Sequence, residues 1–135
     1  MLTRRQALKA LATLGFASSA SGGYALAEPF RTNVTSYAIT PEQWPADLSL
    51  RIAIIADIHA IDPWVSVGRI ERLVAQTNAL QADAVLLLGD FVVGHRLGKL
   101  GKPVPHEKWA RALAGLTAPL GVHAVLGNHD WWERS

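Results

Sequence analysis

Three short apolar runs constrain the fold of this chain most strongly, because each is followed directly by residues suited to tight turns and to chemistry. The runs RIAIIA, AVLLL and VHAVL occupy residues 51–56, 84–88 and 122–126. Each is five or six residues long, is rich in β-branched residues or leucine, and is bounded by Gly or Asp. This pattern is typical of buried strands. The three runs therefore predict three strands of one core.

The segments between these runs have a helical pattern. From Val67 onward, apolar positions recur at steps of three and four residues, which predicts one buried helical stripe: Ile70, Leu73, Val74, Thr77 and Leu80. A second helix is expected over 107–116. Strands joined by helical crossovers pair in parallel, so their carboxyl ends lie along one edge of the sheet. We therefore expect an α/β fold of order βαβαβ with largely parallel strands.

Polar side chains follow each predicted strand, and the fold would bring them to the same edge: Asp57, His59, Asp90, Asn128 and His129, with Asp130 behind. Oxygen ligands combined with imidazole suit divalent Mn, Zn or Fe, and the absence of cysteine excludes a thiolate zinc site. Asp90, on the middle loop, could bridge two ions. For any one loop alone, turn formation is the favoured explanation of Asp, Asn and Gly. Three such loops at one edge favour a metal site.

The order of these motifs, D-x-H at 57–59, G-D at 89–90 and G-N-H-D at 127–130, resembles the first three signature blocks of the calcineurin-like metallophosphoesterase superfamily. The resemblance covers roughly Arg51 to Trp132. It implies that the chain is the N-terminal half of an α/β sandwich that holds two divalent metal ions. It also implies hydrolysis of phosphomonoester, phosphodiester or pyrophosphate bonds.

The resemblance also implies a role for each matching residue. Asp57 and His59 would bind the first ion, Asp90 would bridge the two ions, and Asn128 would bind the second. His129 would lie close to the phosphoryl group as general acid or electrostatic stabiliser, oriented by Asp130.

The superfamily completes its site with further histidines in a G-H block and a later G-H-x-H block, and no histidine follows His129 in this sequence. We therefore expect residues 51–135 to form a partial domain, truncated after the G-N-H-D motif. Whether the isolated chain is active stays open. The alternative is a non-enzymatic, truncated exported fragment that binds metal weakly or binds a partner protein through an exposed apolar edge.

Residues 1–27 have the pattern of an export signal. Arg4 and Arg5 precede an Ala-, Ser- and Gly-rich run that ends in Ala25-Leu26-Ala27, which predicts a signal peptide cleaved after Ala27. The stretch T-R-R-x-x-L-K resembles the twin-arginine signal. We expect the twin-arginine machinery to export the chain to the periplasm or to the outer face of the cytoplasmic membrane. An uncleaved leader would act as an anchor, and the alternative interpretation is an amphipathic N-terminal helix.

The charge balance argues against a nucleic-acid partner. The chain has 13 Lys and Arg residues and 11 Asp and Glu residues. Three of the basic residues and none of the acidic ones lie in the leader, so the segment from Glu28 onward has a formal charge of −1. The basic pI of about 9.3 is therefore largely a property of the leader. Residues 28–50 should form a lead-in, with an edge strand at 33–39 and a loop after it.

Overall fold

The computed structural model describes residues 32–94 and 97–132, so the predicted leader at 1–27 lies outside the described residues. The chain divides into two compact units, Met1–Ser36 and Tyr37–Ser135. All described helices and strands belong to the second unit. Among the described residues, no helix has the length and apolar character needed to cross a membrane.

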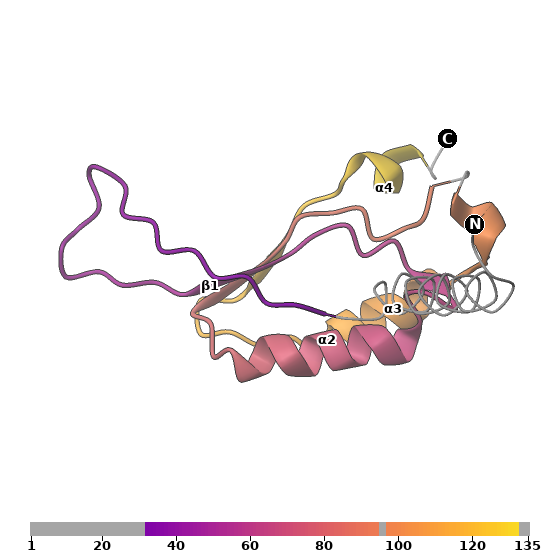
Figure 1. Ribbon diagram of the computed structural model, residues 1–135, viewed down its shortest axis with the longest axis horizontal. Coiled ribbons are helices and arrows are strands. Elements are labelled where there is room, and N and C mark those ends of the chain that lie inside the picture. Colours follow the sequence, from indigo (N-terminus) through magenta and orange to yellow (C-terminus); the bar gives the residue numbers. More distant parts are fainter. Residues whose placement is uncertain (1–31, 95–96, 133–135) are drawn as a thin grey trace, which may run out of the picture. The chain divides into compact units, whose positions relative to one another are not determined.

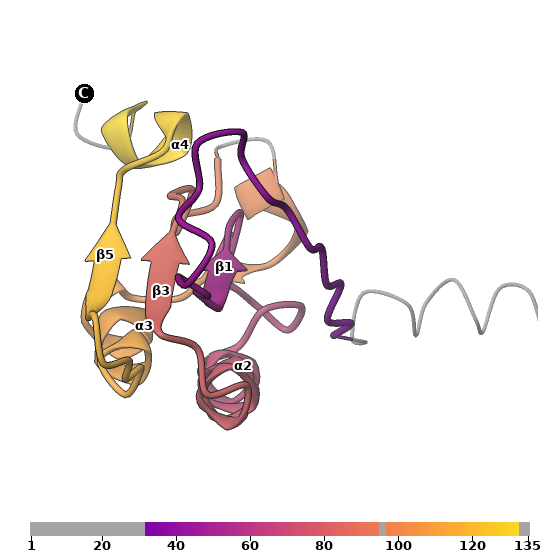
Figure 2. The same cartoon turned by 90° about the vertical axis from the view of Figure 1, so that its left-hand side faces the viewer.

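A three-stranded sheet forms the centre of the second unit. It consists of β1 (Ile52–Ile55), β3 (Ala84–Leu87) and β5 (Val122–Ala124), in the order β1-β3-β5. Both neighbouring pairs are parallel, and all three strands point the same way in Figure 2. The predicted α/β fold with a mainly parallel sheet is thus confirmed. The carboxyl ends of the strands lie at one edge, as parallel pairing requires.

Two helices cover one face of this sheet. α2 (Val67–Ala79) and α3 (His106–Leu113) run along the same side of the strands in Figure 1. α2 buries the stripe that its sequence predicts, through Ile70, Val74 and Thr77. The hydroxyl of Thr77 donates a hydrogen bond of 2.8 Å to the carbonyl oxygen of Leu73, so its burial leaves no polar group unpaired.

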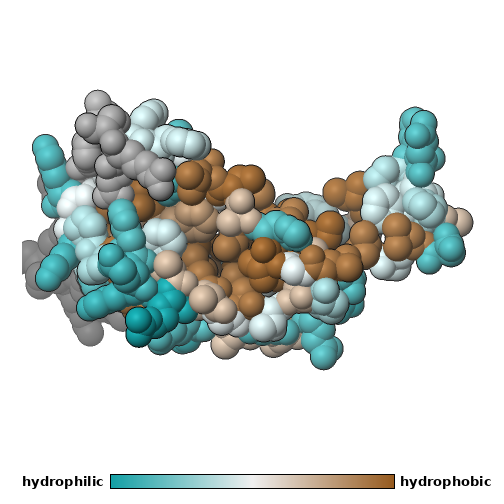
Figure 3. Space-filling view, turned by 180° about the vertical axis from the view of Figure 1, so that it is seen from behind, coloured by the Kyte–Doolittle hydropathy of each residue, from teal (hydrophilic) through white to brown (hydrophobic). Residues whose placement is uncertain are grey.

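Alternation along the strands assigns side chains to the two faces of the sheet. Ala53 and Ile55 of β1 pack with Val85 and Leu87 of β3 in the core beneath the helices. Ile54, between them in sequence, is 60% exposed on the opposite face. Further apolar residues share this open face, namely Ile52, Leu88 and Val125. Figure 3 shows apolar residues gathered over the middle of the surface seen from behind.

Several short elements were not predicted from the sequence. β2 (Ile61–Asp62) and β4 (Lys102–Pro103) pair antiparallel, and η2 (Leu97–Leu100) precedes β4. α4 (Asn128–Trp132) begins inside the G-N-H-D motif, which we had expected to be a loop. β2 and β4 are pairings of two residues each, and η2 and α4 are single turns of four and five residues, too short to show a helical period.

The expected edge strand at 33–39 is corrected by the structure. Residues 32–40 have no strand pairing, although their composition suits a strand. Tyr37 and Ile39 are 83% and 81% exposed, so their side chains pack against almost nothing. Strand propensity reflects packing on a half-buried surface, and that surface is missing here.

Candidate metal centre

The parallel ladder between β1 and β3 continues beyond both strands into the loops that carry the candidate ligands. The N–H of Asp57 donates a hydrogen bond of 3.2 Å to the carbonyl oxygen of Gly89. The N–H of His59 donates one of 2.9 Å to the carbonyl oxygen of Asp90, and Ala60 bonds to Phe91 in the same way. The D-x-H and G-D motifs therefore lie side by side as one extension of the sheet.

The backbone of this extension has an unusual conformation. Asp57, His59 and Asp90 have φ angles of 54°, 43° and 54°. Only one further non-glycine residue among those the structure describes, Gln81, has a positive φ. Residues other than Gly adopt this region at a cost of about 1 kcal/mol or more, and they cluster at functional sites. The strain thus coincides with three of the four residues that we predicted to bind metal.

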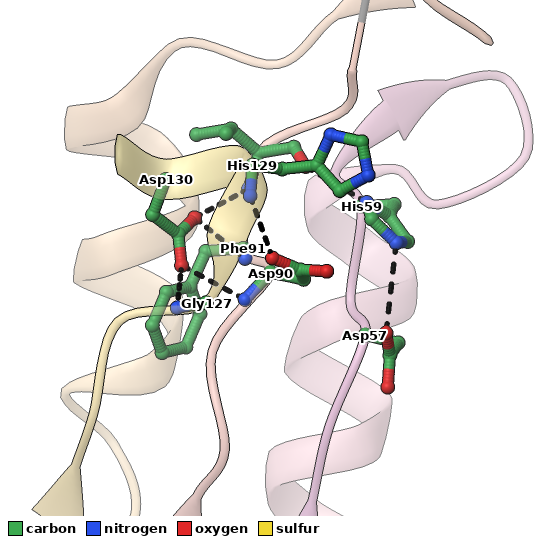
Figure 4. Close-up of polar contacts among 8 residues, drawn as sticks. Asp57, His59, Asp90, Phe91, Gly127, His129 and Asp130 are labelled. Atoms are coloured by element: carbon green, nitrogen blue, oxygen red, sulfur yellow. Dashed lines mark hydrogen bonds and ion pairs between the residues drawn. The ribbon is translucent and has the colours of Figure 1, made fainter. Parts of the chain in front are cut away.

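Three side chains come together at the ends of the strands. His59, Asp90 and His129 each place one ligand atom so that all three atoms lie within 4.8 Å of one another. The two imidazole rings meet edge to face, with their centroids 5.1 Å apart. Asp90 is buried, at 9% exposure, and both histidines are half-buried. Figure 4 shows the three side chains converging, His129 from α4 and the other two from the loops after β1 and β3.

This cluster fits a divalent ion. Two ligand atoms that each lie about 2.0–2.2 Å from one ion are at most about 4.4 Å apart, so these three atoms need only a small inward movement. His129 also has a buried Nδ1 without a hydrogen-bond partner, a polar atom that lacks compensation in the protein alone. A carboxylate with two imidazoles is a ligand set typical of Mn, Fe or Zn.

The tautomer of His59 follows from its contact with the carbonyl oxygen of Val92. Its Nδ1 lies 2.8 Å from the carbonyl oxygen of Val92, and a carbonyl can only accept, so Nδ1 carries the hydrogen. In the neutral ring, Nε2 then keeps its lone pair for a metal ion. The Asp57 carboxylate lies on this side of the ring, with its Oδ1 3.8 Å from Nε2. Asp57 is therefore next to the cluster, although its own side chain is 70% exposed.

The remaining predicted residues occupy different places. Asn128 is the first residue of α4 and has an exposed side chain. Asp130 is buried, and we had expected it to orient His129. Its oxygens instead accept hydrogen bonds from four backbone N–H groups, those of residues 90, 91, 92 and 127 (Figure 4).

Two glycines let the loops after β3 and β5 approach each other closely. Gly89 has a φ of 81°, and a Cβ there would overlap the backbone of Gly127. A Cβ on Gly127 would in turn overlap Oδ1 of Asp90. The turn at Gly89 agrees with its place directly after the second apolar run, but the contact with Gly127 was not predicted. The sequence signal for this contact is that both motifs, G-D and G-N-H-D, begin with a glycine.

Sequence reasoning missed the part that Val92 and Gly94 play. Val92 contributes its carbonyl oxygen to His59, and a Cβ on Gly94 would overlap the ring of His129. Backbone groups are the same in every residue type, so no sequence pattern could have identified Val92. Gly94 carries a weak signal, because glycine often marks a site of close approach.

Comparisons with known proteins identify relatives of the chain. The sequence model of the calcineurin-like phosphoesterase family matches residues 50–135. An uncharacterised metallophosphoesterase of Aquifex aeolicus is 29% identical over 111 residues, which cover 82% of this chain and 40% of that protein. A putative metallophosphoesterase of Caenorhabditis elegans is 35% identical over 83 residues, covering 62% of this chain and 16% of that protein.

A relative with a more specific name is the UDP-2,3-diacylglucosamine pyrophosphatase LpxG of Chlamydia muridarum. It is 30% identical over 82 residues, which cover 61% of this chain and 23% of that protein. The chain thus spans less than half the length of each of these relatives. No solved structure matches the chain significantly.

Proposed function

Because this chain belongs to the calcineurin-like phosphoesterase family, we propose that it serves the metal-dependent hydrolysis of phosphate esters. The substrate would contain a phosphomonoester, phosphodiester or pyrophosphate bond. The convergence of His59, Asp90 and His129 within 4.8 Å carries this proposal. Packing does not explain a cluster of one carboxylate and two imidazoles at the ends of parallel strands, because bringing polar groups together where they are half-buried costs free energy.

The site would hold two divalent ions of Mn, Zn or Fe. His59 and Asp57 would hold one ion, Asn128 would hold the other, and Asp90 would contribute to both. Bound ions of this kind acidify water and neutralise the charge of a phosphoryl group during in-line attack. The chain contributes the orientation of the ligands: His59 is fixed by the carbonyl oxygen of Val92, and Asp90 by the N–H of His129.

His129 would act on the substrate. Its ring lies within the cluster, where the imidazole could donate a proton to the leaving oxygen or stabilise its charge. Asp130 would support this role by holding the loop that carries His129, since its carboxylate bonds to backbone N–H groups.

A pyrophosphate bond is one candidate among the three substrate classes. Two relatives, from Chlamydia muridarum and Chlamydia trachomatis, are named UDP-2,3-diacylglucosamine pyrophosphatases, at 30% and 33% identity over 82 residues each. A nucleotide diphosphate joined to a lipid would be the matching substrate class. We further propose export by the twin-arginine machinery to the periplasm or outer membrane face, on the basis of the leader pattern at 1–27.

The test is hydrolysis in the presence of Mn²⁺. Chromogenic phosphomonoester and phosphodiester substrates, together with a uridine diphosphate sugar, would be assayed with the wild type, Asp90→Ala and His129→Ala. We expect at least one substrate to be hydrolysed, and both variants to lose about a hundredfold or more in rate. His123→Ala is the matched control, because His123 is exposed on β5 and bonds only to the carbonyl oxygen of Leu120. Equal rates in all four proteins would refute the proposal.

The second candidate function is that of a non-enzymatic chain that binds metal or a partner protein. The open face of the sheet favours it, because Ile54 and Val125 expose apolar surface there. Mn²⁺ binding without hydrolysis of any of the three substrate classes would support this candidate.

A further inference from the structure

Asp130 receives hydrogen bonds from both loops that form the cluster. Its Oδ2 accepts from the N–H of Asp90 and of Gly127, each at 2.8 Å. Its Oδ1 accepts from the N–H of Phe91 at 2.9 Å and of Val92 at 3.2 Å. A buried carboxylate needs such compensation, and here the backbone alone supplies it.

The loops also hold each other through a second carboxylate. Oδ1 of Asp90 accepts a hydrogen bond of 2.9 Å from the N–H of His129. Asp90 therefore donates to the loop after β5 with its backbone and accepts from it with its side chain. This bond fixes one oxygen of Asp90 and orients the other oxygen independently of any ion.

The effect of Asp130 extends to the loop after β1. Val92 donates its N–H to Asp130, and its carbonyl oxygen lies 2.8 Å from Nδ1 of His59. Val92 thus connects Asp130 with the imidazole of His59 through the two peptide groups on either side of its Cα. The cluster consists of Asp90, His129 and His59. Asp130 accepts a hydrogen bond from the N–H of Asp90 and directly follows His129 in the sequence. It also bonds to Val92, whose carbonyl oxygen contacts His59.

We propose that Asp130 is the positioning residue of this site, one carboxylate that sets the mutual placement of His59, Asp90 and His129 through the backbone. It touches none of the ligand atoms and would act without exchanging a proton. Replacing its carboxylate by an amide would turn a donor toward two of the four N–H groups and remove the charge that the other two bond to, so the loops after β3 and β5 would separate. The predicted consequence for metal affinity rests on the proposed function, whereas the effect on the loops does not.

Asp130→Asn is the primary test, because the side chains have the same shape and the amide replaces one acceptor by a donor. Amide hydrogen exchange of the 135-residue chain would be followed by NMR spectroscopy without metal. We expect residues 90, 91, 92 and 127 to lose protection together, by about tenfold or more, since hydrogen bonds to a charged acceptor contribute about that factor. Amides of β3 should keep theirs.

Asp83→Asn is the matched control. Oδ2 of Asp83 accepts a hydrogen bond of 2.7 Å from the N–H of Arg51, so it also joins β1 to β3, but at the opposite edge of the sheet. Calorimetric titration with Mn²⁺ should show affinity falling by about 10–100-fold in Asp130→Asn and remaining unchanged in Asp83→Asn. Equal protection of the four amides in Asp130→Asn and the wild type would overturn the proposal.

Asp130→Glu keeps the test decisive if Asp130→Asn does not fold. Glutamate retains the charge and both acceptor oxygens on a longer arm, so the four amides should lose protection as a group but by a smaller factor. A response at some of the four and not at the others would also overturn the proposal. Failure of hydrolysis would refute the proposed function and leave the exchange pattern intact, so the two outcomes are distinguishable.

Discussion

The N–H of Asp90 donates a hydrogen bond of 2.8 Å to Oδ2 of Asp130, which lies 40 positions further along the chain. Both residues are buried, and both accept hydrogen bonds from backbone N–H groups of the other's loop. The loops after β3 and β5 are thereby joined at the place where the candidate ligands converge. The stability of this junction and the properties of the site should therefore depend on the same residues.

Gly127 should tolerate no side chain. In Gly127→Ala the new Cβ would overlap Oδ1 and the backbone N of Asp90, so the loops must separate. We expect the free energy of unfolding, measured by urea denaturation, to fall by about 1–3 kcal/mol. Gly68→Ala is the control: its Cβ would meet only the end of the Arg72 side chain at 3.8 Å, inside α2. The free energy of unfolding of Gly68→Ala should rise by about 0.5–1 kcal/mol. Equal losses in the two variants would contradict the close contact between Gly127 and Asp90.

The two faces of the sheet should respond differently to the loss of a side chain. Ile55 is 8% exposed beneath the helices and its neighbour Ile54 is 60% exposed. Ile55→Ala should lower the free energy of unfolding by about 2–5 kcal/mol, as expected for a truncated core residue. Ile54→Ala should lower it by less than about 1 kcal/mol, mostly through strand propensity. Thermal and urea unfolding of both variants would measure the difference, and a similar loss in each would mean that the second face is covered in solution.

Metal binding should stabilise the fold through Asp90. At a free Mn²⁺ concentration of about 100 times Kd, the free energy of unfolding should rise by about 2.7 kcal/mol, and a chelator should reverse the change. In Asp90→Ala the increase should vanish because the buried carboxylate of the cluster is gone. Glu71→Ala, an exposed change on α2, should keep the full increase. An unchanged increase in Asp90→Ala would place the ion elsewhere.

The absorption spectrum of a bound ion should depend on His59. Co²⁺ added to the wild type should give absorption bands that depend on its ligands, and His59→Ala should alter them and weaken binding about tenfold or more. His123→Ala should leave both the spectrum and the affinity unchanged, because His123 is on β5 and outside the cluster. Identical spectra for the wild type and His59→Ala would exclude His59 as a ligand.

The strands of the central sheet could be predicted from bounded apolar runs, and α2 from its helical period. The three strands were each found within two residues of their observed ends, and α2 begins at the expected Val67. The parallel order followed from the helical crossovers between the strands. The edge strand at 33–39 was expected from composition alone, and the structure shows no strand pairing there, with Tyr37 and Ile39 almost fully exposed.

The residue pattern was enough to predict parallel strands, carboxyl ends that share an edge, and the presence of Asp57, His59, Asp90 and His129 at that edge. What each of these groups contacts depends on the folded loops. Asp130 bonds to four N–H groups, and His59 bonds to the carbonyl oxygen of Val92. These partners are peptide groups, which every residue carries alike, and their positions are set by the folded loops. Residue identity therefore predicts which side chains meet, whereas their orientation depends on backbone geometry that exists only after folding.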